Sequence, residues 1–491
     1  MRRREVKQGP TPKRLDGRMF LEHRARRPVN SQPKTAALRN AAVPAASSGR
    51  VSRREPPTGG IFAGMVVFML APLAALGVER FPPPEFEPRY VMPLTTAPAP
   101  RADWLAWLDV AVLAITLGLA AWFVLKKRSR PMILGLGIFS LAYFGFYRKG
   151  CVCAIGSIQD VSLSLFNHGV ALPLTIAAFF LLPIIFALFF GRVFCAGVCP
   201  QGALQDLVLI KPVQLPFWLE RVLRVIPFLY LGAAVLFAAT GGPFLICEWD
   251  PFVALFRRYG ATTMLALGGG FLLVGAFVGR PYCRFLCPYG AILSVFSRVS
   301  KWRVRLAPED CIQCGICDNA CPYGAIEEPV PAGVEKVNKT VDAGWAIAAG
   351  VGLVMIVGGI VLGGNLSEAL SRGNPTVSLA NRITQEESGR FKDTTEASQA
   401  YRQTARPLQE LYDQATQVRA QFAVGGRWLG GFVGLAFGAT LFSLVIRRPA
   451  AIYDPDRADC VACGRCYRYC PKELSRVKRA SRKPVPAPKP A

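Results

Sequence analysis

Long apolar runs recur along the chain and predict its architecture. Eight of them have the length that crosses a bilayer as a helix, about 17 to 25 residues. They lie at residues 61–78, 104–125, 131–147, 169–190, 222–240, 261–279, 343–363 and 428–446. Polar and charged stretches separate these runs. The pattern therefore predicts a mainly α protein, a polytopic membrane bundle of about eight transmembrane helices.

The polar stretch between the last two apolar runs has a helical period. From 394 to 422, apolar residues recur three or four positions apart, which is typical of one face of a helix. Pro407 lies inside this pattern and should kink or restart the helix, because proline lacks a backbone N–H. We therefore expect an outer helical hairpin over 364–427, which either packs on itself or offers a docking or sensing surface.

The charge of this 491-residue chain is concentrated at its ends. The formal net charge is +26, and 52% of the residues are hydrophobic. Residues 1–58 hold 15 Lys and Arg against 4 Asp and Glu, and residues 472–491 hold 7 against 1. Basic ends beside membrane segments favour contact with membrane lipid, and we expect no nucleic-acid partner. We interpret 1–58 as a disordered basic cytoplasmic arm and 476–491 as a basic, Pro-rich tail.

Basic loops between the apolar runs predict the orientation. With the N-terminus in the cytoplasm, residues 126–130, 298–305 and 447–448 fall inside, as the positive-inside rule requires. The basic pairs at 148–149 and 257–258 fall outside, against the rule. We expect a multi-pass protein of the bacterial cytoplasmic (inner) membrane with both termini in the cytoplasm.

Two cysteine runs share the spacing Cys-x2-Cys-x2-Cys-x3-Cys-Pro. This is the bacterial ferredoxin signature, in which the fourth cysteine of each run ligates the cluster held by the other run. The expected ligands of two [4Fe-4S] clusters are Cys311, Cys314, Cys317 and Cys470 for the first, and Cys460, Cys463, Cys466 and Cys321 for the second. Structural zinc sites and a disulfide framework are the alternatives. Zinc needs neither the third cysteine nor the Cys-Pro ending, and a cytoplasmic location argues against disulfides.

The two cysteine runs follow the sixth and the eighth apolar run. An even number of crossings lies between them, so both are expected on the cytoplasmic side. They form the halves, 306–342 and 448–475, of one small ferredoxin-like α+β domain. A transmembrane pair at 343–447, with the outer hairpin, is inserted between these halves, and a six-helix membrane core at 59–305 precedes them.

Seven further cysteines lie between the membrane runs. Two copies of a Cys-x3-Cys-Pro motif supply four inner cysteines: Cys195, Cys199, Cys283 and Cys287. A looser third copy and a separate loop supply three on the outer side: Cys151, Cys153 and Cys247. Four thiolates suffice for a further iron–sulfur or other soft-metal centre, whereas three are one short. Packing as small apolar side chains is the alternative for both groups, and an outer disulfide involving Cys247 is another for the three.

At these motifs the chain resembles the NosR/NapH family of membrane iron–sulfur (polyferredoxin) proteins. The resemblance covers residues 191–326 and the C-terminal ferredoxin half. It implies electron transfer between the quinone pool or the cytoplasm and an extracytoplasmic redox partner. In such a protein the ferredoxin cysteines and the four inner cysteines would be the cofactor ligands.

The chain departs from that family in three respects. The NosR members carry an outer FMN-binding domain, and we expect none before residue 104. The Gly-Ala-Thr triplets at 260–262 and 438–440 lack the preceding hydroxyl residue of a flavinylated threonine, so we expect no FMN on this chain. A separate flavin-binding subunit would then replace it. The ferredoxin run is also split, and the three outer cysteines are additional, so a role in nitrate or nitrous oxide metabolism does not follow.

Two functions fit these observations. The first is an electron conduit, either a quinol dehydrogenase or an electron-transfer subunit, with carriers on both sides because the apolar core of a bilayer is about 30 Å thick. The second is a redox-sensing or maturation protein of the NosR type, in which the outer hairpin reports the state of the clusters.

Acidic residues are relevant to the electron conduit and to a third possible function, a transporter. Quinol oxidation would need proton acceptors, and the outer-side candidates are Asp160, His168, Glu248 and Asp250. A transporter is disfavoured, because it would need polar groups within the membrane and Asp109 is the only acidic residue that we find in the apolar runs.

Overall fold

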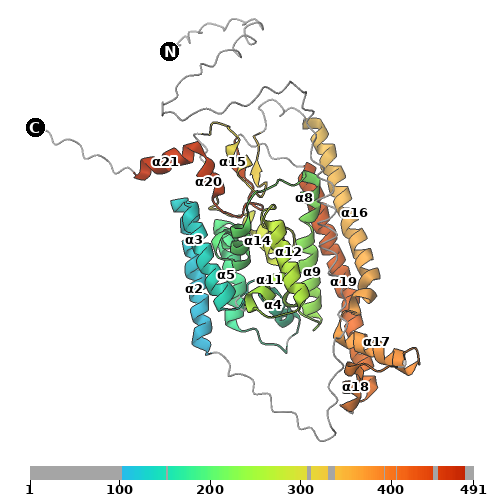
Figure 1. The fold of residues 1–491 in the computed structure, drawn as a ribbon. Helices are drawn as coiled ribbons and strands as arrows, with labels where there is room; N and C mark the ends of the chain where they lie inside the picture. The colour runs from blue at the N-terminus through green and yellow to red at the C-terminus, as the bar shows by residue number, and fades with distance from the viewer. Residues whose placement is uncertain are drawn as a thin grey trace, which may run out of the picture. The chain divides into compact units, whose positions relative to one another are not determined.

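The computed structural model describes residues 102–150, 153–167, 169–306, 311–329, 338–391, 393–404, 406–445 and 452–481. Within these ranges the regular structure is helical apart from one two-stranded sheet (Figure 1). Several sequence-based expectations lie outside the described residues: the basic arm, the first apolar run, Cys151, His168 and the end of the tail.

Five helical segments of the described part are long and apolar enough to cross a membrane. They are α2 (Asp103–Trp122) with η2 (Phe123–Lys127), α3 (Arg130–Ser140) with η3 (Leu141–Tyr147), α8 (Phe217–Leu223) with α9 (Ile226–Ala239), α16 (Asn338–Ser371) and α19 (Leu408–Val445). Each coincides with an apolar run of the sequence. The chain is therefore a mainly helical membrane protein.

Two further apolar runs form shorter helices, α5 (Leu174–Phe190) and α12 (Thr262–Gly275). At 1.5 Å per residue the 14 residues of α12 span roughly 21 Å, less than the apolar core of a bilayer. Arg280 has a left-handed backbone and Pro281 begins the next helix, so a continuous helix cannot extend through this point. The total of eight spans stays a prediction.

Short helices lie between the long ones and carry the cysteine motifs. They are α4 (Ser157–Phe166), α6 (Val193–Gly197), α7 (Pro200–Val208), α10 (Leu245–Trp249), α11 (Pro251–Arg257), α13 (Pro281–Phe285) and α14 (Pro288–Ser297). Four of them begin with proline, whose fixed φ suits the first helical position and whose missing N–H is not needed there. The Cys-Pro pairs of the sequence therefore determine where α7 and α14 start.

The outer surface of the long helices is apolar, as a lipid-facing surface must be. On α16 the side chains of Leu353, Val354, Val361 and Leu362 are more than half exposed. Exposed apolar area is unfavourable in water but not among lipid tails, which are as apolar as leucine. This face of α16 is thus suited to the bilayer.

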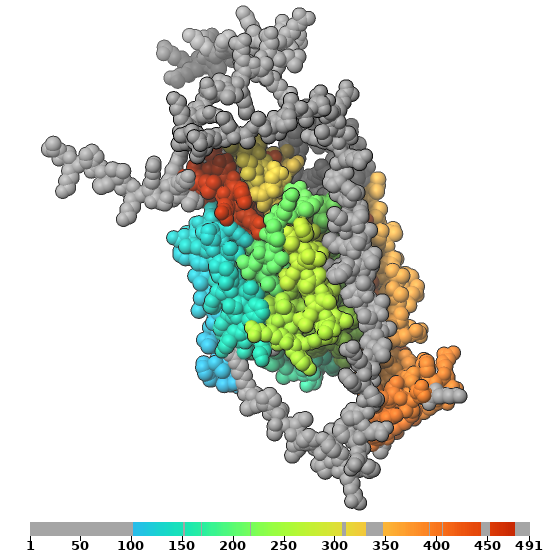
Figure 2. Space-filling view, in the orientation of Figure 1, coloured from blue at the N-terminus to red at the C-terminus, as the bar shows by residue number. Residues whose placement is uncertain are grey.

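The two ferredoxin halves, far apart in sequence, form one unit. β1 (Ile326–Glu327) of the first half pairs antiparallel with β2 (Asp454–Pro455) of the second, and the Asp456 N–H donates to the Ala325 carbonyl at 2.8 Å. The helices of this unit are α15 (Ile316–Asn319), α20 (Arg465–Tyr469) and α21 (Pro471–Ser481). Figure 2 shows the halves, yellow and red, as one continuous patch. The inserted helix pair therefore does not separate them.

α16 and α19 carry the chain away from this unit and back. Between them lie α17 (Pro375–Glu387) and α18 (Glu396–Gln403), at the far end of the pair in Figure 1. The predicted interruption at Pro407 falls between α18 and α19. Val377 of α17 and Leu411 of α19 belong to one small buried core, so the hairpin packs on itself.

Glycines let α16 and α19 approach to backbone contact. On α19 they recur every fourth residue, at 426, 430, 434 and 438. A Cβ at Gly430 would overlap the carbonyl oxygen of Gly359, and a Cβ at Gly363 would overlap that of Gly426. Small residues at this spacing associate helices in membranes, because closely approaching backbones gain van der Waals contact.

This contact predicts different effects for two neighbouring glycines of α16. Gly359→Leu should weaken the helix pair by about 1–3 kcal/mol, because the new side chain meets the backbone of α19. Gly358→Leu is the matched control, since a Cβ there has nothing within 4 Å. Thermal unfolding of the detergent-solubilised protein should show a lower midpoint for Gly359→Leu alone. Equal midpoints for the two variants would contradict the packing.

Candidate iron–sulfur sites and their support

Both ferredoxin runs fold into the same pair of turns. In each run the residue before the second cysteine, Gln313 or Ala462, has a left-handed backbone with φ of 51° or 54°. The glycine after that cysteine, Gly315 or Gly464, is left-handed as well. A left-handed non-glycine residue costs roughly 1–2 kcal/mol, so its recurrence at matched positions indicates a required geometry. Such turns direct backbone N–H groups into a concavity that suits an iron–sulfur cluster.

The cysteines of the two halves meet crosswise. Burial and then the charge of Cys463 raise the pKa of the Cys321 thiol to about 11, so the last cysteine of the first run lies beside the second run. Burial also raises the pKa of Cys317 to about 11, and Cys470 of the other run contributes to the rise. Both neighbour relations follow the crossing that the ferredoxin spacing predicts.

Among the residues that the structure describes, no three His, Cys, Asp or Glu side chains converge as they would around a single metal ion. A four-iron cluster does not need such convergence, because each thiolate binds a different iron. The donor types, the repeated turns and the crosswise arrangement of the cysteines fit two [4Fe-4S] clusters.

The second cysteine of each Cys-x3-Cys-Pro motif precedes a proline-initiated helix. Cys287 caps α14, and its Sγ accepts a hydrogen bond from the Gly290 N–H at 3.3 Å. Cys199 has the same position before α7. Burial raises the pKa of the Cys199 thiol, and a hydrogen bond from the Gly202 N–H opposes that rise. After burial, the charge of Cys283 is the next cause that raises the pKa of both Cys199 and Cys287, so the two motifs bring their cysteines together.

The first cysteine of each motif faces a side-chain N–H. Gln205 Nε2 donates to Cys283 Sγ at 3.2 Å, and a guanidinium nitrogen of Arg192 lies 3.9 Å from Cys195 Sγ. N–H donors directed at cysteine sulfurs stabilise thiolates and tune the potential of an iron–sulfur centre. Neutral thiols packed as apolar side chains need no such donors. The arrangement therefore favours a redox centre over apolar packing.

Two arginines hold the motifs together reciprocally. Arg280, before the second motif, donates to the Cys195 carbonyl of the first, and a Cβ at Gly202 would lie 3.3 Å from its guanidinium. Arg192, before the first motif, passes Gly290 of the second, where a Cβ would also lie 3.3 Å from the guanidinium. Each motif therefore packs against the arginine of the other motif. Gly202 and Gly290 have no side chain and so leave space for the two guanidinium groups.

A buried ion-pair network joins these motifs to the second ferredoxin half. Asp206 of α7, with a side chain only 3% exposed, pairs with Arg130 of α3. It also contacts Arg280 at 3.4 Å and Arg465 of α20 at 3.0 Å. Burial opposes ionisation, but the three guanidinium groups outweigh it and hold the pKa of Asp206 well below its usual range. Arg130 further donates to the Cys463 carbonyl at 3.0 Å, so the network reaches a cluster-binding turn.

Further polar contacts fasten the second half around this network. They join Arg192 to the Ala458 carbonyl, Arg224 to Asp459, Arg303 to Asp454, and Arg128 to Glu473. Sequence reasoning missed all of these residues, together with Gln205 and Asp206. A usable signal was present, because Gln-Asp recurs at 159–160 and 205–206 within an otherwise apolar core.

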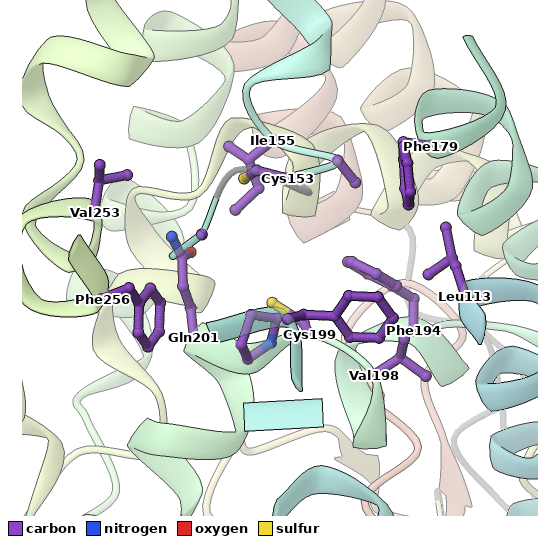
Figure 3. A pocket seen from close by; sticks show the side chains of 14 residues that line it. Leu113, Cys153, Ile155, Phe179, Phe194, Val198, Cys199, Gln201, Val253 and Phe256 are labelled. Carbon is purple, nitrogen blue, oxygen red and sulfur yellow. The ribbon is translucent and has the colours of Figure 1, made fainter. Parts of the chain in front are cut away.

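The third copy of the motif lies across a pocket from the first. Figure 3 shows Cys153 on one side of this pocket and Cys199 on the other, with Phe179 and Phe194 among the apolar residues that line it. Cys153 and Cys247 are not joined by a disulfide. The other pairing considered, Cys151 with Cys247, involves a residue outside the described part of the chain. The sequence assigns the inner and outer cysteines to opposite sides and does not indicate that both groups border one pocket.

The candidate proton acceptors have different surroundings. Asp160 is half-buried, which raises its pKa, whereas Glu248 is exposed. Asp250 is buried at 3% exposure, and burial raises its pKa to about 6. Asp109, inside α2, pairs with Arg148 at 2.8 Å, which agrees with a structural role rather than a transport site.

Family comparisons match the same cysteine-bearing segments. The family model described as "4Fe-4S binding domain" matches residues 172–219 and 261–306, which contain the four inner cysteines. A second model with that description matches residues 304–327, the first ferredoxin run. No solved structure matches the chain.

Three relatives share these segments. YccM of Escherichia coli (strain K12) is 31% identical over 172 residues, which cover 32% of this chain and 46% of YccM. The regulatory protein NosR of Pseudomonas aeruginosa is 28% identical over 317 residues, 56% of this chain and 42% of NosR. The ferredoxin-type protein NapH of E. coli is 27% identical over 228 residues, 41% of this chain and 75% of NapH. The chain is similar to membrane iron–sulfur proteins of the NosR/NapH kind.

This NosR/NapH-like protein spans less than half the length of YccM and NosR. The relatives are named as ferredoxin-type and regulatory proteins, and the family matches support iron–sulfur binding in this chain.

Removing the charge of Asp206 should loosen the second ferredoxin half. Asp206→Asn leaves Arg130 and Arg280 buried without their counter-charge, at a cost of about 3–5 kcal/mol. Because the folded pKa of Asp206 is lowered, this stabilisation is present above its unfolded pKa and is lost as the pH falls through the folded pKa. Calorimetry at neutral pH should show a lower unfolding midpoint.

The control for this variant is Glu368→Gln. Glu368 pairs with Arg372, but the two side chains are 77% and 66% exposed, so the pair contributes about 0–1 kcal/mol at most. A midpoint for Asp206→Asn that equals that of Glu368→Gln would show that the buried network does not fasten the domain.

The crosswise arrangement predicts which serine variants resemble each other. Cys321→Ser and Cys466→Ser should damage the same cluster and leave the same residual EPR spectrum, because both residues belong to one ligand set. Cys317→Ser and Cys470→Ser should leave the other spectrum. Low-temperature EPR of the reduced protein measures the difference. A spectrum shared by Cys321→Ser and Cys317→Ser would mean that each run holds its own cluster.

Proposed function

We propose that this protein is an electron conduit of the bacterial cytoplasmic membrane. It would move electrons between two cytoplasmic [4Fe-4S] clusters or the quinone pool and an extracytoplasmic redox partner or flavin-binding subunit. The observation that carries the proposal is the succession of cysteine groups through the core, from the ferredoxin domain past the inner four to Cys153 across the pocket. When bound, each iron–sulfur cluster supplies storage for one electron at its site.

The ligand assignment within this proposal follows the two repeats. The ferredoxin clusters would be held by Cys311, Cys314, Cys317 and Cys470, and by Cys460, Cys463, Cys466 and Cys321. The inner centre would be held by Cys195, Cys199, Cys283 and Cys287.

Contacts of the chain support transfer between the ferredoxin domain and the inner cysteines. Arg192 donates to the Ala458 carbonyl at 3.0 Å, and another nitrogen of the same guanidinium lies near Cys195 Sγ. Arg130 joins the Cys463 carbonyl to Asp206. These bridges hold the second half at a fixed separation from the inner cysteines. A fixed, short separation supports electron transfer, because its rate falls steeply with distance.

The pocket supports the next transfer, toward the outer cysteines. Its walls include Leu113, Phe179 and Phe194, so the space between Cys199 and Cys153 is apolar. Apolar surroundings exclude water and limit side reactions of a reduced centre. Beyond it, Asp160 borders a second cavity and is a proton acceptor available to a quinol.

A redox-sensing function is the second candidate, and the helix pair favours it. α16 and α19 connect α17 and α18 directly to the two ferredoxin halves, and the contact of Gly359 with Gly430 holds the pair closely together. A displacement of the domain would therefore reach the hairpin. One relative, NosR, is named a regulatory protein.

Reoxidation by a quinone distinguishes the two functions. The purified protein, with its clusters reduced, should be rapidly reoxidised by a water-soluble quinone analogue in a stopped-flow measurement. Cys199→Ser should slow this reaction at least about tenfold, because it removes a ligand between the domain and the pocket. Gly358→Leu is the control and should react at the rate of the unchanged protein.

The opposite outcome favours the sensor. In that case the clusters stay reduced in the presence of the quinone, and reduction changes the protease sensitivity of α17 and α18. These two results together would reject the conduit and support the sensing function.

A further inference from the structure

The outer cysteines repeat the geometry of the inner site. Gln205 Oε1 accepts the backbone N–H of the residue just before Cys283 at 3.1 Å. Gln159, the matching residue of the third copy, accepts the backbone N–H of the residue just before Cys247 at 3.0 Å. Cys247 therefore has the same relation to α4 as Cys283 has to α7. This correspondence joins two sequence segments that share no visible motif.

Asp250 occupies the place that Cys287 has in the inner site. Cys287 precedes Pro288 and accepts a backbone N–H from the helix that the proline begins. Asp250 precedes Pro251 in the same way, and its carboxylate accepts the Phe252 N–H at 2.9 Å. Asp250 and Cys287 are both buried. Carboxylate and thiolate are both anionic ligands for transition metals, so Asp250 supplies a donor that a search for cysteines overlooks.

Cys153 completes the correspondence with Cys199. Each is followed three residues later by a glycine whose N–H opposes the rise that burial causes in the pKa of the thiol. Cys153, Cys247 and Asp250 line the same cavity. A Cβ at Gly156 would lie 3.6 Å from Cys247 Sγ. The two thiols and the carboxylate are therefore neighbours.

Two further observations point to a ligand among these three groups. A cavity is bordered by Cys153, Cys247 and Asp250. Gln159 is fully buried, and its Nε2 has no hydrogen-bond partner among the described residues. The matching nitrogen of Gln205 donates to a sulfur of the inner site. A buried amide N–H without an acceptor costs roughly 1–3 kcal/mol. A ligand atom that accepts a hydrogen bond from Gln159 Nε2 would remove this cost.

We propose that Cys153, Cys247 and Asp250 bind a further iron–sulfur cluster, with the Asp250 carboxylate in place of one cysteine. Cys151 lies outside the described residues and is not needed for the argument. The centre would be the outer carrier of the proposed conduit, and only this assignment of its role rests on the proposed function. Cys247 is exposed, so this end of the site is open to an outer redox partner.

Iron and acid-labile sulfide analysis with EPR, on the full chain purified anaerobically, tests the proposal. Asp250→Asn keeps a side chain that can cap α11 but removes the anionic ligand. It should lose about two to four irons per chain while the ferredoxin signals remain. Asp250→Cys should keep the wild-type iron content but change the EPR g-values and the reduction potential of this centre, because the ligand has changed. Glu248→Gln, on an exposed neighbouring carboxylate, should change neither quantity.

Three results would overturn the proposal. One is wild-type iron and an unchanged spectrum in Asp250→Asn, which a role limited to capping α11 predicts because asparagine can also cap. Another is the same iron loss in Asp250→Cys as in Asp250→Asn, which a structural role of the carboxylate predicts. If Asp250→Asn does not accumulate, Cys247→Ser tests the same cluster at an exposed side chain, and full iron content there is the third. Quinone reoxidation is measured separately: iron loss in Asp250→Asn with clusters inert to quinone would retain this site and reject the conduit.

Discussion

The buried carboxylate of Asp206 is the interaction on which the rest of the structure depends. Removing a charge from water costs several kcal/mol per ion, and a single partner seldom offsets that cost. Asp206 has three, and they come from three different parts of the fold: Arg130 from a long helix, Arg280 from the second Cys-x3-Cys motif and Arg465 from the second ferredoxin half. The network is favourable only when all three parts are in place. The network adds to the apolar contacts of Ile326, Val461 and Tyr467, which belong to the same buried core as the long helices. Together they hold the ferredoxin domain in one position against the membrane core.

The internal repeat explains why the core can hold so many polar side chains. Each copy places a glycine three residues after a cysteine, and at Gly202 and Gly290 that glycine lies against the guanidinium of the opposite copy. A larger residue at either position would displace an arginine and leave its buried charge without a partner. The repeat therefore combines a space requirement with an electrostatic one. Both requirements involve the cysteine-bearing turns, so a centre bound there as proposed would couple metal ligation to folding in this region.

Periodicity and spacing predicted the helical membrane architecture, five of the spans and the meeting of the two ferredoxin halves, because these features follow from local hydrophobicity and from a repeated ferredoxin motif. The same reasoning did not find Asp206, Gln205 or the role of Asp250. These residues act through partners more than 40 positions away, and single-sequence patterns carry no information on such pairs. The short α12 was also unexpected. Its apolar run is long enough to span a bilayer, but α12 ends at Gly275, and a left-handed Arg280 with the following proline prevents a continuous helix into α13.

The two core sites share a scaffold but differ in the charge around them, and this difference bears on how an added electron would be distributed. Burial raises the pKa of Cys283 to about 12, while the charges of Arg280 and Arg192 oppose that rise, so positive charge lies near the inner thiol. Burial and then the charge of Asp250 raise the pKa of Cys153 to about 12, so negative charge lies near the outer thiol. Because reduction adds negative charge, nearby cations and N–H donors stabilise the reduced form of a centre and nearby carboxylates destabilise it. With clusters bound as proposed, this difference in neighbouring charge would favour an electron at the inner site over one at the outer site.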